Sequence, residues 1–161
     1  MRVLNEHFRL LPASPESAGE LMDTLASKGD LLWPHERWPR MRFNGPLAVG
    51  AVGGHGPIRY AIEEYDPGRR IVFRFTAPLG FHGTHSFVVN SREGGCELRH
   101  TLEMRVSGRA HLTWLLVIRP LHDALLEDAL DKAESVLTEK DWVKRGWPVW
   151  VRVLRRMLAG R

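Results

Sequence analysis

The sequence predicts an α+β fold in which an antiparallel sheet wraps around one long helix near the C-terminus. Between Ile58 and Val106, apolar and polar residues alternate with the period of two that half-buried strands show. Turn sequences interrupt this alternation at 66–69, 77–80 and 91–94, so the strands follow one another as hairpins. After the strands, apolar residues recur at helical spacing from Thr113 to Glu139, the only later segment long enough to cover the sheet.

Size and composition indicate one globular domain followed by a separate tail. The chain has 161 residues, of which 43% are hydrophobic and 26% charged, so it can bury a core. We assign residues 1–140 to the domain and 141–161 to a basic C-terminal helix. The single cysteine, Cys96, excludes an internal disulfide, and its inward place in a strand favours a buried, unreactive thiol. Residues 1–12 are too short and too charged for a signal peptide, so we expect a cytoplasmic protein.

The chain begins with a predicted strand and a short helix. Alternation over residues 2–11 predicts a strand whose apolar side chains Leu4, Phe8 and Leu10 point inward. Ser14 is placed as an N-cap, with proline at the first helical position behind it. The amphipathic helix that follows ends before glycine 29.

The connection after this helix is predicted to be irregular, because two Trp-Pro pairs, at Trp33 and Trp38, prevent a long helix. Tryptophans in such a loop either cap the mouth of a pocket or bury the connection. Residues 47–52 predict a strand, and the Gly-Gly-His-Gly sequence at 53–56 predicts a hairpin turn with His55 exposed. The glycine spacing matches neither GxGxxG nor GxxxxGK, and no helix follows, so a phosphate-binding loop is not expected.

The long helix is predicted to begin at 110–118 and to kink at Pro120. Its apolar stripe comprises Leu121, His122, Leu125, Leu126, Ala129, Ala133, Val136 and Leu137. His122 therefore lies on or beside the buried stripe, either as a satisfied core residue or as part of a site.

Three stretches of the sequence resemble a known superfamily. They are the strand start Gly56-Pro57-Ile58-Arg59-Tyr60, the hairpin Glu64-Tyr65-Asp66-Pro67-Gly68-Arg69-Arg70-Ile71, and the helix Ile118-Arg119-Pro120-Leu121-His122-Asp123-Ala124-Leu125. In these stretches and in element order, residues 1–140 are similar to a bacterial member of the SRPBCC superfamily, which holds START lipid-transfer domains, pollen allergens and polyketide cyclases/dehydrases. The resemblance implies the helix-grip fold with a hydrophobic cavity between sheet and long helix, and it carries over no catalytic residue.

Strand register predicts a polar group inside this cavity. Counting back from a four-residue loop at 91–94 sets His85 opposite His100 on the inner face. The same register pairs Phe87 with Leu98 and Gly83 with Leu102, and the glycine is expected to leave room for a ligand. Counting across the turn at 66–69 predicts that Glu64 lies near the two histidines, and His122 is expected to approach them from the long helix. The predicted ligand-binding residues are Tyr60, Glu64, Phe73, Phe75, Gly83, His85, Phe87, Leu98, His100, Leu102, Met104 and His122.

Three chemistries fit two histidines beside a carboxylate. They could bind a divalent metal, supply acid and base groups for a cyclisation or dehydration, or form the polar end of an apolar cavity. The sequence lacks a compact metal motif such as HExxH, and we expect neither a metal nor a cofactor. We favour non-enzymatic binding or transport of a lipophilic molecule or lipid. The alternatives are a polyketide cyclase-like enzyme and an interaction module that the basic C-terminal helix tethers to a membrane or a partner.

The tail concentrates the positive charge. The whole chain carries +4, whereas residues 141–161 hold six Lys or Arg against one Asp, a net +5, which leaves −1 for residues 1–140. The folded body therefore has no basic excess, and nucleic acid is not an expected partner. Pro148 opens a predicted helix that runs to about Leu158, whose Trp, Val, Leu and Arg content is typical of a helix in a membrane interface. The alternatives are packing on the domain or on a second copy in a homodimer.

Overall fold

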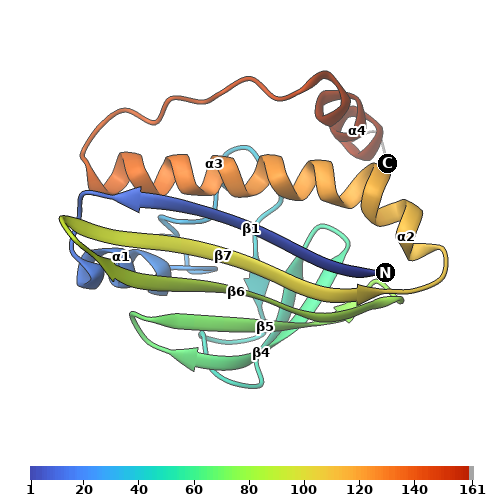
Figure 1. The fold of residues 1–161 in the computed structure, drawn as a ribbon, viewed down its shortest axis with the longest axis horizontal. Helices are drawn as coiled ribbons and strands as arrows, with labels where there is room; N and C mark the ends of the chain where they lie inside the picture. Colours follow the sequence, from blue (N-terminus) through green and yellow to red (C-terminus); the bar gives the residue numbers. More distant parts are fainter. Residues whose placement is uncertain (160–161) are drawn as a thin grey trace.

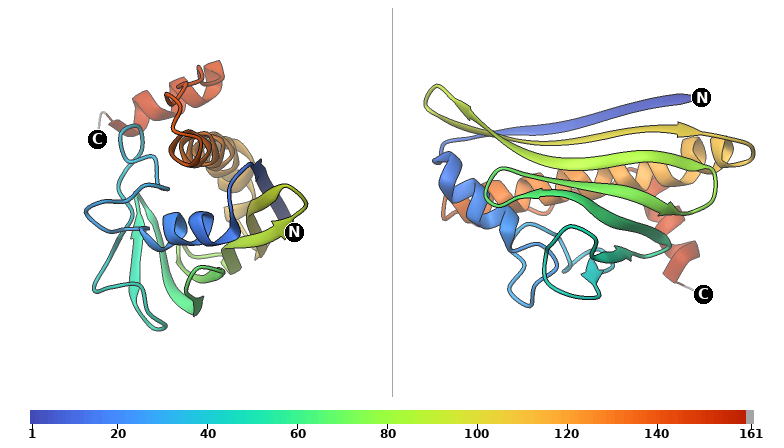
Figure 2. Two further views of the ribbon diagram at one scale, coloured as in Figure 1. Left: turned by 90° about the vertical axis from the view of Figure 1, so that its left-hand side faces the viewer. Right: turned by 90° about the horizontal axis from the view of Figure 1, so that it is seen from below.

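The computed structural model describes residues 1–159, in which seven antiparallel strands curve around one long helix (Figures 1 and 2). The strands are β1 (Arg2–Leu11), β2 (Arg42–Phe43), β3 (Val52–His55), β4 (Ile58–Asp66), β5 (Arg70–Ala77), β6 (Phe81–Arg92) and β7 (Gly95–Val106). The helices are α1 (Pro15–Asp23), α2 (Ala110–Thr113), the π-helical segment η1 (Trp114–Ile118), α3 (Arg119–Leu137) and α4 (Val149–Ala159). The strand order is β1-β7-β6-β5-β4-β3-β2, so the first strand, β1, lies at one edge of the sheet beside the last strand, β7. The predicted fold class is confirmed.

The long helix crosses the sheet without a break at its proline. α2, η1 and α3 follow one another directly, and Pro120 falls within the first turn of α3. Proline has no N–H to donate to the carbonyl four residues earlier, that of Leu116. Five residues of wider π-helix immediately precede this point, which is how the backbone accommodates the missing bond. Leu125, Leu126 and Ala129 of α3 are buried against the sheet, as the predicted stripe requires.

The first strand faces the opposite way from the prediction. Leu4, Phe8 and Leu10 are 63%, 52% and 60% exposed, whereas the alternate residues Val3, Asn5, His7, Arg9 and Leu11 point towards α3. The prediction was wrong because acidic residues on α3 lie over this strand. Asn5 donates to Asp123 at 3.0 Å, and Arg9 donates to Asp131 at 2.6 Å. Polar pairing therefore sets the face of β1, against its hydrophobic pattern.

The last hairpin is tighter than predicted. Its loop is the two residues Glu93 and Gly94, because Arg92 pairs with Gly95. Gly94 has φ = 77°, the left-handed conformation that such a short turn needs. The register is consequently shifted by two residues, so His85 pairs with Leu102 and Phe87 with His100. A shift of two keeps every side chain on its predicted face.

Most of the glycine-rich segment 53–56, which was predicted to be a turn, belongs to a strand. β3 occupies Val52–His55, and the predicted strand at 47–52 is a turn up to residue 51. Gly53 and Gly54 lie so close to their neighbours that a Cβ would come within 2.1 Å of the Arg42 carbonyl and 2.0 Å of the Ile58 carbonyl. Glycine here serves close strand pairing, and the pairing turns His55 inward.

The tail returns along the long helix and packs on it. In Figure 1 the chain after α3 runs back over the helix, and α4 lies above its N-terminal part. Val151 and Leu154 of α4 are buried, at 2% and 5% exposure. The carboxylate of Asp128, itself buried in α3, accepts hydrogen bonds from Trp147 of the tail at 2.9 Å, from Trp38 at 2.7 Å and from Arg37 at 2.6 Å. One face of the predicted C-terminal helix therefore packs within the chain.

We expect replacement of Asp128 by alanine to lower the free energy of unfolding by about 3–5 kcal/mol, because two indole N–H groups and a guanidinium lose their buried acceptor. Urea unfolding followed by circular dichroism measures this change. Asp141→Ala, at an exposed aspartate, is the control and should change stability by less than about 0.5 kcal/mol. A small effect at position 128 would show that the carboxylate does not hold the tail.

Candidate functional site

A cavity of about 280 Å³ lies between the sheet and the long helix. Phe75, Phe81 and Leu102 form its floor on the strands, and Ile118, Leu121 and Leu125 form its roof on the helix. Trp33 and Trp38 close one side, so they both bury their loop and wall the cavity. Arg155 and Leu158 of α4 lie at the cavity as well, which places the tail at its mouth.

Three of the four histidines that line the cavity lie close to one another: His85, His100 and His122. The Nδ1 of His85 lies 3.3 Å from the Nε2 of His100, within hydrogen-bonding distance, and the rings of His100 and His122 are 5.1 Å apart. The other nitrogens, His85 Nε2, His100 Nδ1 and His122 Nδ1, are buried without a hydrogen-bond partner among the described residues. Burial lowers the pKa of all three imidazoles below 6.5, well below for His85 and His100, so they are neutral at pH 7.

Neutrality fixes what the histidine pair offers a ligand. A neutral imidazole has one N–H and one lone pair. If His85 donates to His100, then His85 Nε2 is a free acceptor and His100 Nδ1 a free donor; if His100 donates, these roles reverse. Either way the pair leaves one buried donor and one buried acceptor unsatisfied, which costs about 1–3 kcal/mol for each group. A hydroxyl or amide group of a ligand can donate or accept a hydrogen bond, so it would satisfy whichever of the two nitrogens it reaches in either tautomer.

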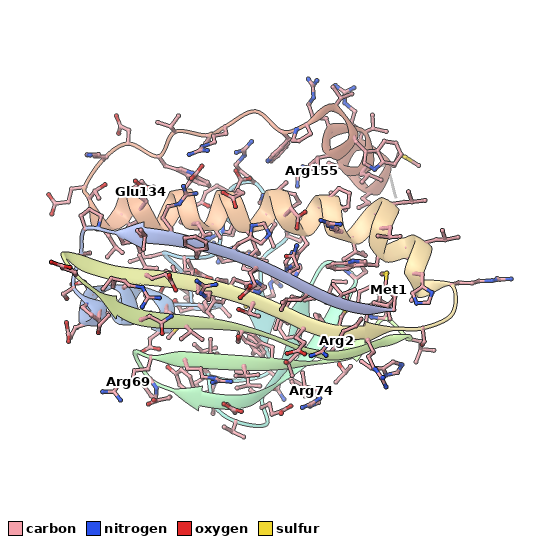
Figure 3. All side chains as sticks on the ribbon, viewed as in Figure 1. Met1, Arg2, Arg69, Arg74, Glu134 and Arg155 are labelled. Carbon is pink, nitrogen blue, oxygen red and sulfur yellow. The ribbon has the colours of Figure 1, made fainter. Side chains whose placement is uncertain are left out.

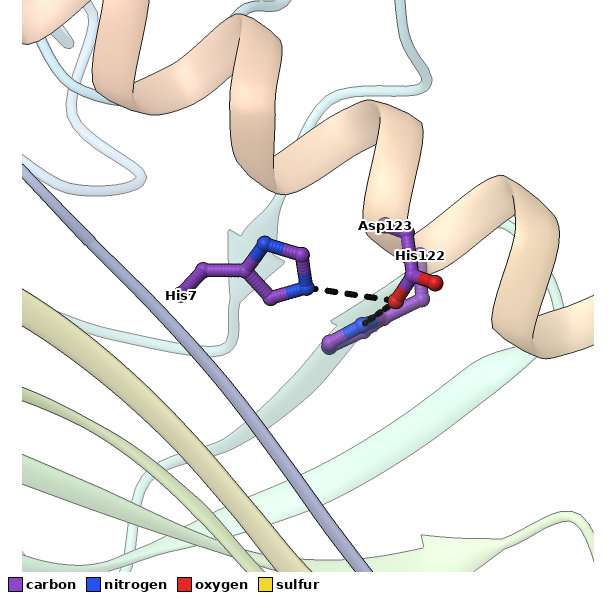
Figure 4. Close-up of side chains that lie close together, drawn as sticks. All are labelled: His7, His122 and Asp123. Carbon is purple, nitrogen blue, oxygen red and sulfur yellow. Dashed lines mark hydrogen bonds and ion pairs between the residues drawn. The ribbon is translucent and has the colours of Figure 1, made fainter. Parts of the chain in front are cut away.

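A charged cluster that includes His7, His122 and Asp123 lies between β1 and α3 (Figure 4). His7 bonds Glu127 at 2.8 Å and Asp123 at 3.2 Å, while His122 Nδ1 lies 3.6 Å from Asp123, beyond hydrogen-bonding range. Burial lowers the pKa of His7, but its bonds to Asp123 and Glu127 outweigh burial and raise the pKa above 6.5. Each ring nitrogen of His7 lies within hydrogen-bonding distance of a carboxylate oxygen, an arrangement that favours the protonated ring.

The same cluster is the set of described residues that could hold a metal ion. Ligand atoms of His7, His122 and Asp123 all lie within 4.8 Å of one another, and two imidazoles with a carboxylate suit a divalent transition metal. A metal would have to displace the proton that His7 shares with its carboxylates. The guanidinium of Arg119, 3.7 Å from Asp123, adds a further positive charge that opposes it. The contacts present are those of an ion-pair network.

The structure places five of the predicted ligand-binding residues on the cavity wall: Phe75, His85, His100, Leu102 and His122. Others pack behind that wall: Tyr60 and Phe73 contact the His85 ring at 4.8 and 4.7 Å, Phe87 contacts His100, and Leu98 and Met104 belong to the core. These residues shape and hold the histidines. Their part in binding a ligand stays a prediction.

Two predicted residues do not have the expected geometry. Glu64 is exposed and pairs with Arg70 at 3.2 Å, because an irregularity in β4 between Ile62 and Glu64 shifts the register and turns the carboxylate outward. Gly83 provides no space for a ligand. A Cβ there would lie 2.2 Å from the Glu103 carbonyl, so a side chain would strike β7 before it reached the cavity.

Sequence reasoning missed the far wall of the site. His55 was predicted to be exposed, yet it lines the cavity and packs against Trp33, with the two ring centres 4.7 Å apart and the rings tilted by 52°. Burial lowers the pKa of His55 to about 3. The signal was available in the pattern, because Val52–His55 continues into Ile58 with only a tight turn between. Strand pairing sets His55 opposite Ile58, which is buried, and the His55 ring then lies 6.0 Å from that of Tyr60.

Comparison with known proteins gives the fold. No protein-family model matches the sequence, and no curated protein sequence matches it. Among solved structures, norcoclaurine synthase from Thalictrum flavum, in complex with dopamine and hydroxybenzaldehyde, is 17% identical over 88% of this chain and 90% of that one, with a TM-score of 0.62. The di-domain ARO/CYC protein StfQ from the steffimycin biosynthetic pathway is 16% identical over 86% of this chain and 51% of that one (TM-score 0.65). Ara h 8.0201 is 11% identical over 87% and 100% (TM-score 0.60).

The fold and the cavity together define an α+β protein of the helix-grip class. The three similar structures share that fold with this chain at identities of 11–17%. The helix-grip fold that the resemblance to the SRPBCC superfamily implied is confirmed.

The buried imidazoles predict that stability falls on acidification. The unfolded chain takes up protons on histidines near pH 6.5, while folded His85, His100 and His122 do not, so unfolding is favoured as pH drops below 6.5. By pH 5 this amounts to up to about 2 kcal/mol for each imidazole that stays neutral. The contribution of His7 has the opposite sign: it is complete below pH 6.5 and is lost as pH rises through its raised pKa.

Urea unfolding at pH 5 and pH 7.5 measures this dependence. We expect His100→Leu to lose up to about 2 kcal/mol less than the natural protein over that range, because one titrating group is gone. The comparison of the two proteins cancels the other ionisable groups. His82→Gln, at an exposed histidine outside the cavity, is the control substitution. An unaltered pH dependence in His100→Leu would mean that His100 is protonated in the folded protein.

Proposed function

We propose that the protein binds a small, uncharged lipophilic molecule in the cavity between the sheet and α3, with a polar group of the ligand against His85 and His100. The observation that carries the proposal is the unsatisfied donor and acceptor of this histidine pair in an otherwise apolar cavity. Apolar walls with a few convergent polar groups are typical of small-molecule sites.

Volume and charge narrow the ligand class. About 280 Å³ is at the lower end of the roughly 300–1,000 Å³ of ligand pockets, which favours a compact ligand such as a one- or two-ring compound. The histidines are neutral, so they provide no charge to offset the cost of burying a carboxylate or an ammonium group. The guanidinium of Arg155 at the mouth already stacks on Trp38 and Trp147, at 4.3 and 4.1 Å. A hydroxyl or an amide on an apolar body fits best.

The similar structures support this kind of ligand. The norcoclaurine synthase structure holds dopamine and hydroxybenzaldehyde, two small aromatic molecules, on the same fold. We infer a ligand of comparable size for this chain, and no reaction is inferred from the likeness.

An acid–base enzyme related to the polyketide cyclases is the weaker alternative. General acid–base catalysis is efficient when the pKa of the catalytic group lies near the working pH. Burial holds the pKa values of His85 and His100 well below 6.5, so both are weak bases, and the expected carboxylate, Glu64, lies outside the cavity. The histidine pair is better suited to orient a ligand than to move protons.

We expect Leu121→Trp to weaken binding of the fluorescent probe 1-naphthol at least about tenfold, because the larger ring extends from α3 into the cavity. Fluorescence titration measures the dissociation constant. The matched control is Leu137→Trp, a half-buried leucine on the same helix away from the cavity. Equal affinity of Leu121→Trp and the natural protein would place the binding site elsewhere.

The histidine pair should distinguish 1-naphthol from 1-methylnaphthalene, which has nearly the same shape but no hydroxyl group. We expect the natural protein to prefer 1-naphthol by about tenfold, the worth of one satisfied buried pair. His85→Leu/His100→Leu should bind the two compounds equally well, because both imidazoles, and with them the donor and the acceptor, are gone. A preference for 1-naphthol that survives these substitutions would show that another group holds the hydroxyl.

A further inference from the structure

An exposed apolar surface borders the mouth of the cavity. It is formed by two stripes: Leu112, Leu115 and Leu116 of α2 and η1, and Val149, Trp150, Val153, Met157 and Leu158 of α4. These side chains are between 36% and 66% exposed. We call these eight residues the mouth surface. A concentration of large apolar side chains of this kind on one face marks an interaction site.

The two stripes adjoin. The indole N–H of Trp150 donates to the carbonyl of Leu116 at 2.8 Å, which joins α4 to η1. That carbonyl lacks its α-helical partner because the residue four positions on is Pro120. Leu158, the last residue of the α4 stripe, also lines the cavity, and so do Val117 and Ile118 of η1. The mouth surface is therefore continuous with the cavity wall.

The acidic and basic residues that neighbour the mouth surface on α2, η1 and α4 are all basic. No Asp or Glu occurs between Glu103 and Asp123, and none follows Asp141. Arg109, Arg152 and Arg156 are exposed on these elements, and none of the three forms an ion pair with any residue from 1 to 159. In Figure 3, Arg155 instead points from α4 towards the long helix, where it stacks on tryptophans. Apolar side chains with free arginines and no acids complement an anionic lipid surface.

We propose that the mouth surface docks on an anionic lipid bilayer and presents the cavity mouth to it. This proposal rests on the proposed function, because a lipophilic ligand that enters from a membrane need not cross water. The contact is peripheral: no helix within the described residues is both long and apolar enough to cross a bilayer. Val149, Trp150 and Met157 enter the interfacial layer, and Arg152 and Arg156 meet lipid phosphates and carboxylates.

Cosedimentation of the full chain with vesicles tests the proposal. The probes are vesicles of phosphatidylcholine with 30% phosphatidylserine and vesicles of phosphatidylcholine alone, each at low and high salt. We expect binding to the anionic vesicles at 50 mM NaCl and a loss of at least about tenfold at 300 mM NaCl, because salt screens the arginines.

Two pairs of matched variants distinguish binding through the mouth surface from nonspecific adsorption of the protein to vesicles. Arg152→Glu/Arg156→Glu should weaken vesicle binding at least about tenfold, whereas Lys28→Glu/Arg69→Glu, the same charge change at exposed residues elsewhere, should not. Val149→Ser/Met157→Ser removes side chains that are 66% and 63% exposed and should also weaken binding. Its control, Leu4→Ser/Leu10→Ser on β1, removes side chains that are 63% and 60% exposed and should bind as the natural protein does.

Three results would overturn the proposal. The first is no binding of the natural protein to anionic vesicles, and the second is equal vesicle binding by each surface variant and its control. The third is a dimer in solution that Val149→Ser/Met157→Ser dissociates, because a second copy of the chain would then cover the mouth surface. Titration of every variant with 1-naphthol in the absence of vesicles is the check on folding. It also separates the two proposals, since unchanged 1-naphthol affinity with no vesicle binding removes only the membrane contact. Vesicle binding without any 1-naphthol binding would instead remove the cavity function.

Discussion

The carboxylate of Asp128 is the interaction on which the arrangement of the site depends. It is 3% exposed, and three donors from two distant segments converge on it: Arg37 and Trp38 from the loop after α1, and Trp147 from the tail. One cavity wall and the element at the mouth are thereby fixed to the same residue of the long helix. Arg37 and Arg155 stack on either side of this cluster, each about 4 Å from the Trp147 ring (4.0 and 4.1 Å). A charge buried in this way stabilises only while all its partners are present.

A second polar contact repeats this arrangement one turn further along the helix. Lys132, 6% exposed, donates to the carbonyls of Asp30 and Trp33 and to the carboxylate of Glu36. The loop between α1 and β2, which contains Trp33 and Trp38, has no helix or strand of its own, so it depends on these contacts with α3 for its shape. The cavity wall is built from an irregular segment that the long helix holds in place.

The fold followed from local pattern, and the errors arose where distant charges decide the outcome. Alternation and turn residues placed strands β4 to β7 and the long helix, because each buries one continuous apolar face. The prediction of which face of β1 points inward was wrong, because both faces contain apolar residues. Asp123 and Asp131, more than a hundred residues later, determine the inward face through their hydrogen bonds to Asn5 and Arg9. The hairpin register was wrong because Ser91-Arg92-Glu93-Gly94-Gly95 allows more than one loop length, and only pairing selects it.

The site was predictable where it depends on strand period and unpredictable where it depends on loops. His85, His100 and His122 were found because a polar ring on an apolar face stands out in either periodicity. The inward position predicted for Glu64 was wrong because β4 has an irregularity between Ile62 and Glu64, and the alternation of the sequence gives no sign of it. His55, Arg155 and Leu158 reach the cavity from a glycine-rich strand and from the tail, and no local pattern connects either to the sheet.

Pro120 connects the interior of the long helix to the placement of the tail. By withholding one N–H it leaves the Leu116 carbonyl without an α-helical partner, and Trp150 donates to that carbonyl. The tail thus recognises a backbone atom, so the side chain at position 116 is free to vary without loss of this contact. Pro120 therefore adds a backbone attachment point for the tail at the cavity entrance, beside the side-chain attachment at Asp128.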